Sequence, residues 1–147
     1  MAVQFTLKDQ SGSDVERTQF TRDYVLLSFH PLAWTSVCEK QMLSLENNYH
    51  QFREIRVVPL GISVDAVPTK KAWAKHMNLN NLSILSDFWP HGALADMLGL
   101  FLEDRGTSAR ANVLLDLEGE IVFSQTCEIS KIPDVEDLLH RIKKELG

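Results

Sequence analysis

The chain has 147 residues, of which 44% are apolar and 24% charged, and its formal net charge is −5. This length and composition fit one globular domain over residues 1–147 and exclude disordered and fibrous proteins. Lysines and arginines are scattered rather than clustered, so we expect neither nucleic acid nor an acidic membrane surface as a partner.

The predicted elements follow from the spacing of apolar residues, which is helical in some segments and nearly continuous in others. In chain order we expect a strand over 5–9, a turn over 10–14, a buried strand over 25–29, a helix over 38–52, a second buried strand over 56–63 that contains Pro59, a helix over 68–77, a short strand over 82–85, a short helix over 92–98, a hairpin of 112–115 with 120–124, and a helix that opens at Pro133. Strands that alternate with helices, followed by a hairpin and a closing helix, predict an α/β sandwich with a mixed central sheet.

Cysteine usage and the N-terminus indicate the compartment. No apolar run approaches the roughly 20 residues that cross a bilayer, and the first residues lack a basic region followed by an apolar one. With two cysteines and no secretion signal, free, metal-binding or catalytic thiols are favoured over a structural disulfide. We therefore expect a cytoplasmic protein.

Cys38 lies where the buried strand over 25–29 leads into the next helix. The first N–H groups of a helix have no internal partner and carry the positive end of its dipole, which favours a thiolate. Thr35, one helical turn earlier, can direct its hydroxyl at the sulfur or cap the helix, and Pro31 closes the turn without adding an amide N–H. A buried cysteine that only fills space is the alternative. The combination nevertheless predicts a reactive cysteine.

Pro31, Thr35 and Cys38 also match a Pro-x-x-x-Thr-x-x-Cys signature. With this signature the chain resembles the peroxiredoxins, the thiol peroxidases of the AhpC/TSA family in the thioredoxin-like superfamily. Further matches are segment 5–9, the Phe-Trp-Pro-His-Gly segment over 88–92, and Arg110, which lies six residues before an aspartate. The resemblance runs from residue 5 to the C-terminus and implies a thioredoxin-like sandwich.

The resemblance implies a role for each of these residues. Cys38 would be the peroxidatic thiolate, which attacks a hydroperoxide and becomes a sulfenic acid. Arg110 would hold the thiolate and stabilise the charge on the departing oxygen. Thr35 would orient the peroxide, and Pro31 would shield the intermediate from water. Gln41 stands where many relatives carry glutamate, and it either helps to place the arginine or is a plain helix residue.

The second half of the reaction needs a thiol that removes the sulfenic acid. No cysteine follows Cys127, and the position five residues beyond Cys38 is Leu43. Cys127 is thus the remaining candidate for a resolving cysteine, although a small residue at a strand end is the favoured interpretation. We expect one-cysteine behaviour, as in the compact bacterial members of the family, with an external thiol or a thioredoxin- or glutaredoxin-like protein as the reductant.

Other partners and functions are constrained more loosely. The substrate class is a small hydroperoxide, and the family resemblance implies a homodimer. The five histidines show no metal-site spacing and the Cys-x-x-Cys pair is absent, so no metal and no cofactor is expected. A redox sensor, or a thiol–disulfide exchange protein of the same fold, remains the alternative to a peroxidase.

Overall fold

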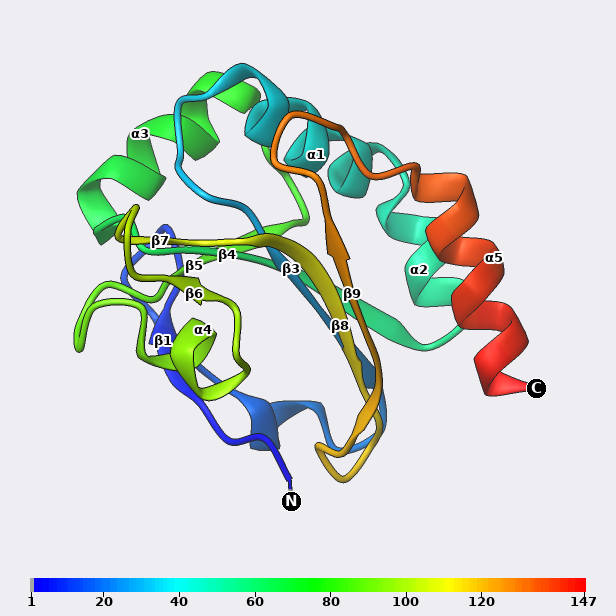
Figure 1. Cartoon of the computed structure of the whole chain (residues 1–147). Coiled ribbons are helices and arrows are strands. Elements are labelled where there is room, and N and C mark those ends of the chain that lie inside the picture. Colours follow the sequence, from blue (N-terminus) through cyan, green and yellow to red (C-terminus); the bar gives the residue numbers. More distant parts are fainter. Residues whose placement is uncertain (1) are drawn as a thin grey trace.

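A mixed β-sheet forms the centre of the molecule, with helices on both faces (Figure 1). The structure is a computed structural model that describes residues 2–147. Its strands are β1 (Thr6–Lys8), β2 (Asp14–Glu16), β3 (Tyr24–Phe29), β4 (Val57–Ser63), β5 (Ser83–Ser86), β6 (Phe101–Leu102), β7 (Thr107–Ser108), β8 (Arg110–Leu115) and β9 (Ile121–Cys127). Seven of them form the sheet in the order β2-β1-β5-β4-β3-β8-β9, and β6 pairs with β7. The predicted fold class is confirmed.

The centre of the sheet consists of the apolar runs that were predicted to be buried strands. Strand β4 runs parallel to both β3 and β5, whereas β8 runs antiparallel to β3. Pro59 pairs with Leu26 of β3, but β5 joins β4 only from Leu60 onward. One edge of β4 is therefore still unpaired at Pro59, which explains how a residue without an N–H fits in a central strand.

The helices are η1 (Arg17–Phe20), α1 (Ser36–Asn47), α2 (Tyr49–Glu54), α3 (Val67–Met77), α4 (Ala93–Met97) and α5 (Val135–Leu146). Helices α1, α2, α3 and α5 pack over one face of the sheet and share one apolar core with it. On the other face, a second core contains α4 and the N-terminal strands. No helix within residues 2–147 has the length and apolar character needed to span a membrane.

The helix expected over 38–52 is two helices, α1 and α2, which meet at Asn48. The backbone of Asn48 leaves the helical region (φ −111°, ψ 15°), and its side-chain amide donates to the carbonyl of Ser44 at 2.7 Å. The backbone N–H of Asn48 also donates to this carbonyl, at 3.2 Å, so the side chain adds a second donor at the last turn of α1, where the helix ends. The prediction of one continuous helix was wrong.

The C-terminal hairpin is longer than expected, and the extension places two predicted site residues. Strands β8 and β9 pair from Arg110 with Cys127 to Leu115 with Ile121. The added part of β9 begins with Gln125 and Thr126, which are polar and exposed, so the apolar pattern of the sequence could not reveal it. Helix α5 begins just after Pro133, where Asp134 accepts from two backbone N–H groups as the N-cap.

Candidate active site

Cys38 is the third residue of α1, at the end of the loop that leaves β3. The loop is held by Asp65, whose carboxylate accepts from the N–H of Ala33 at 2.8 Å. Trp34 takes a left-handed backbone conformation (φ 66°), which is uncommon for a large side chain. Thr35 is the N-cap residue, but its hydroxyl donates to the carbonyl of Leu32 at 2.9 Å and does not cap the helix.

A buried arginine contacts the Cys38 sulfur. Arg110 is the first residue of β8, and its Nη1 lies 3.3 Å from Cys38 Sγ. The other side of the guanidinium is fixed by the carbonyl of Ile129, which accepts from Nε at 3.0 Å and from Nη2 at 2.7 Å. Because only 2% of Arg110 is exposed, its charge acts with little screening by water.

Gln41, one turn beyond Cys38, connects this arginine to the sheet. Its amide nitrogen donates to Ser28 Oγ at 2.8 Å and to the carbonyl of Phe29 at 3.2 Å. Those two contacts leave the amide oxygen to accept from Arg110 Nη1 at 2.6 Å. The guanidinium is thus fixed from two sides, by the Gln41 side chain and by the loop after β9.

The four residues predicted to be catalytic come together around one cavity of about 260 Å³. Pro31, Thr35, Cys38 and Arg110 all line it, and Ile129 is also part of the wall. Only 1% of Cys38 is exposed, so a small molecule reaches the sulfur through this cavity and not from open surface. Leu32, Val37 and Ile129 add apolar wall, so the cavity presents a sulfur and a guanidinium in largely apolar surroundings and has room for a small molecule only.

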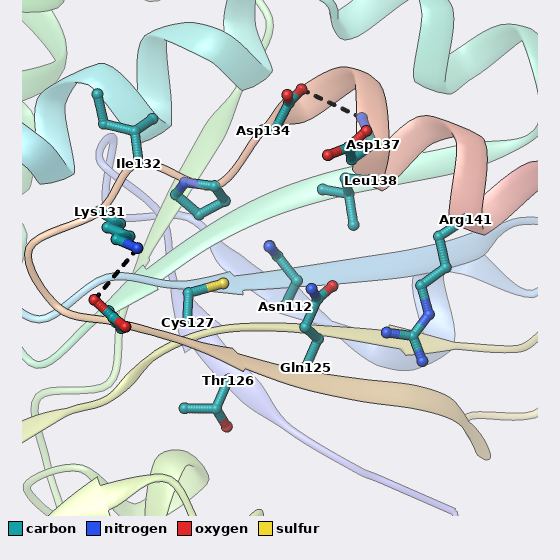
Figure 2. Close-up of a pocket in the computed structure, with 12 residues that line it drawn as sticks. Asn112, Gln125, Thr126, Cys127, Lys131, Ile132, Asp134, Asp137, Leu138 and Arg141 are labelled. Atoms are coloured by element: carbon teal, nitrogen blue, oxygen red, sulfur yellow. Dashed lines mark hydrogen bonds and ion pairs between the residues drawn. The ribbon is translucent and has the colours of Figure 1, made fainter.

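Cys127 lies outside this cavity, although it pairs with Arg110 across the two strands. Both cysteines are free thiols. Figure 2 shows Cys127 and Asn112 beside a second cavity, of about 400 Å³, whose wall includes part of the segment 128–133. Burial raises the pKa of the Cys127 thiol, and the nearby Arg110 charge lowers it in part. Cys127 therefore favours the protonated thiol more than an exposed cysteine does.

Some contacts of the site were missed from the sequence. The Ile129 carbonyl is a backbone group, and no side-chain pattern marks it. Lys70 is fully buried, and its position was readable: buried residues of α3 recur at 70, 73, 74 and 77, which is the spacing of one helix face. Its partner is His30, at 2.8 Å.

Within residues 2–147 no group of three or more metal-binding side chains is placed to hold an ion.

The fold and the site together define the class: a thioredoxin-like α/β protein with a cysteine at a helix N-terminus beside a buried arginine. Comparison with known proteins identifies the family. The model of the AhpC/TSA family matches residues 1–124, and the chain belongs to that family.

Two kinds of relatives support this assignment. The chain is 34% identical over 134 residues to alkyl hydroperoxide reductase E of Mycobacterium tuberculosis, over 90% of this chain and 87% of the relative. Among solved structures it is similar to the reduced 2-Cys peroxiredoxin of Plasmodium vivax (29% identity, TM-score 0.86, 97% of this chain and 78% of that one). The fold also matches AhpC of Enterococcus faecalis (20% identity, TM-score 0.90, 98% and 89%). The family predicted from the sequence is confirmed.

Proposed function

We propose that this protein is a thiol-dependent peroxidase that reduces hydrogen peroxide or organic hydroperoxides through Cys38. The observation that carries the proposal is the 3.3 Å contact between Arg110 Nη1 and Cys38 Sγ at the start of α1. Two sources of positive charge, the guanidinium and the first-turn N–H groups, favour the thiolate. The family assignment supports the same activity, because relatives are named as peroxiredoxins and alkyl hydroperoxide reductases.

In the proposed reaction the Cys38 thiolate attacks one oxygen of the hydroperoxide. The sulfur–oxygen bond forms as the oxygen–oxygen bond breaks, which leaves a sulfenic acid and water or an alcohol. The hydrogen bonds described above engage four of the five guanidinium N–H groups of Arg110. The remaining Nη2 hydrogen is available, among the described contacts, for the departing oxygen, whose negative charge it would stabilise.

Three neighbours would prepare this step. Because the Thr35 hydroxyl donates its hydrogen to Leu32, its oxygen is left to accept a hydrogen bond from the peroxide O–H. Pro31 forms part of the cavity wall without an N–H of its own and would keep water from the sulfenic acid. Gln41 would act as a positioning residue, since its contact with Arg110 fixes the guanidinium.

A thiol must then return Cys38 to the reduced state. An external thiol, or a thioredoxin- or glutaredoxin-like protein, is the proposed reductant. Cys127 is the candidate for an internal resolving cysteine, because it pairs with Arg110 beside the site and opens on a cavity of its own. A 38–127 disulfide would require rearrangement of the segment after β9, since the Ile129 carbonyl in that segment holds Arg110 against Cys38.

The decisive experiment compares two serine variants in a thiol-supported peroxide assay. Cys38→Ser should abolish peroxide consumption, whereas Cys127→Ser should retain it with an external dithiol. Unchanged consumption in Cys38→Ser would overturn the proposal. Stoichiometric oxidation of Cys38 without turnover, under any reductant, would instead indicate a redox sensor, and insulin reduction would indicate thiol–disulfide exchange.

We also propose a cytoplasmic location and a homodimer. Two free thiols suit a reducing compartment. Trp34, Phe88 and Trp89 expose 51%, 51% and 81% of their area, and such aromatic surface is available to a second copy. Light scattering of the purified protein would test the dimer, and a monomer at micromolar concentration would contradict it.

A further inference from the structure

The cavity of about 400 Å³ beside the ends of β8 and β9 shares no lining residue with the Cys38 cavity. It lies between the sheet, which contributes Asn112 and Cys127, and the segment 128–133 with the first two turns of α5 (Figure 2). Sites for small molecules commonly have volumes of about 300–1,000 Å³. The attack of Cys38 on a peroxide does not involve this cavity, so its lining needs a separate explanation.

The side-chain oxygen of Asn112 is buried and has no hydrogen-bond donor among residues 2–147. Only 2% of Asn112 is exposed, and this residue lines the cavity from the sheet. A buried polar atom without a partner destabilises the fold, and native proteins pair nearly all such atoms. A bound molecule with an N–H or O–H group would supply the missing donor.

Two opposite charges on the α5 side of the cavity have no charged partner in the described part of the chain. The Arg141 guanidinium stacks on the Phe123 ring, with Cζ 4.1 Å from the ring centre, so its N–H edge is left for a carboxylate. The Asp137 carboxylate, one turn earlier, can accept from an ammonium group. Glu128 and Lys131 face each other at 3.7 Å. The cavity therefore matches a small zwitterion with an N–H donor, as in an amino acid or a short peptide.

The Cys127 thiol adds a reactive group to this wall. Figure 2 shows its sulfur pointing toward the side of the cavity on which Asn112 lies. Burial raises the pKa of the thiol, and it reacts slowly with a dissolved disulfide because the thiolate is the nucleophile. A disulfide that is bound in the cavity stays beside the sulfur, and this proximity compensates for the low thiolate content.

We propose that the cavity binds the disulfide of a small peptidic thiol, the class that includes glutathione, and that Cys127 captures one half of it as a mixed disulfide. Asn112 Oδ1 accepts from a peptide N–H, Arg141 binds a carboxylate and Asp137 binds an ammonium, while the other half of the disulfide extends into solvent.

The exchange balances in atoms and electrons. The Cys127 sulfur bonds to one sulfur of the disulfide as the sulfur–sulfur bond of the ligand breaks. Cys127 is oxidised, the ligand is reduced, and the proton of Cys127 leaves with the released thiol. A thiol-supported peroxidase would itself produce such a disulfide, and only this origin of the ligand rests on the proposed function.

Exchange kinetics test whether binding precedes the reaction. In Cys38→Ser, where Cys127 is the sole thiol, mass spectrometry follows mixed-disulfide formation over a range of glutathione disulfide concentrations. The rate should saturate, because a complex forms first. With 2-hydroxyethyl disulfide, which carries no charge for Arg141 or Asp137, the rate should rise linearly. No mixed disulfide, or a linear dependence for both reagents, would overturn the proposal.

Substitutions in the cavity test the assigned contacts in the same Cys38→Ser background. Asn112→Leu and Arg141→Met should each raise the half-saturating concentration of glutathione disulfide about tenfold. Lys144→Met, which removes an exposed cation of α5 outside the cavity, should not change it. The rate with 2-hydroxyethyl disulfide should stay constant in all variants that fold, and Arg141→Met alone decides if Asn112→Leu does not fold.

Equal half-saturating concentrations in Arg141→Met and Lys144→Met would refute the assigned contacts and with them the proposed site. Saturating exchange at Cys127 in a protein that consumes no peroxide with Cys38 intact would support the site and refute only the proposed function.

Discussion

Replacement of Arg110 by methionine removes the cation that contacts the reactive sulfur. Arg110 Nη1 and Cys38 Sγ are 3.3 Å apart, and unit charges at that separation attract by roughly 5 kcal/mol at an effective dielectric constant of about 20. The first-turn N–H groups and the water that enters the cavity replace part of this interaction. We therefore expect a loss of about 3 kcal/mol of transition-state stabilisation, or roughly a hundredfold in rate.

The assay is the initial rate of peroxide consumption with an external dithiol in excess, for Arg110→Met, Arg110→Lys and a matched surface variant. Lysine keeps the charge but cannot contact Gln41 and Ile129 together, so Arg110→Lys should retain an intermediate rate. Arg105 is exposed, and Arg105→Met controls for the loss of one positive charge. Circular dichroism establishes that each variant is folded.

A folded Arg110→Met protein with a rate within threefold of wild type would refute this reasoning. Equal rates in Arg110→Met and Arg105→Met would show that the contact seen in the structure has no part in the chemistry.

Three further substitutions test separate parts of the structure. Thr35→Val should lower the peroxide rate by about tenfold and Thr35→Ser should restore it, because only the valine variant lacks the oxygen that accepts the peroxide hydrogen bond; a fully active valine variant would contradict this role. Burial lowers the pKa of Lys70 from 10.5 to about 7, so between those pH values the unfolded chain binds more protons and the free energy of unfolding rises with pH. Lys70→Met should lose this rise of a few kcal/mol (~3), measured by urea unfolding at neutral and alkaline pH, and parallel curves for the two proteins would contradict it. Asp134→Ala removes the acceptor for two N–H groups of α5 and should lower the free energy of unfolding by about 1 kcal/mol, and no change relative to Glu136→Gln would contradict the cap.

The parts of the fold that the sequence predicted are those where local pattern and burial agree. The buried strands β3 and β4 are almost continuous apolar runs, and α5 has a regular apolar face. All three elements could therefore be located from the spacing of apolar residues alone. The break at Asn48 was not predictable from periodicity, because the apolar spacing continues through it and only the side-chain bond to Ser44 marks the end of α1. The far end of β9 pairs through its backbone and remains exposed, so it left no apolar signal.

The site divides in the same way between local and distant contacts. Pro31, Thr35 and Cys38 lie within eight residues, and one strand–loop–helix connection places all three at the cavity. Arg110 is 72 residues from Cys38, and only the family resemblance connected the two before the structure did. The hydrogen bonds from Arg110 to Ile129 use a backbone carbonyl, and every residue has one, so no residue type marks this contact in the sequence. Lys70 was overlooked because a lysine is normally solvated, although its place on the buried stripe of α3 was visible.

The most direct test of the central claim is mass spectrometry of the reduced protein after one equivalent of hydrogen peroxide, with dimedone present to trap sulfenic acid. The account predicts that the peptide containing Cys38 carries the dimedone adduct, or a disulfide to Cys127 if that thiol reacts first. Complete consumption of the peroxide should accompany the modification. An unmodified Cys38 with the peroxide left in solution would contradict the account.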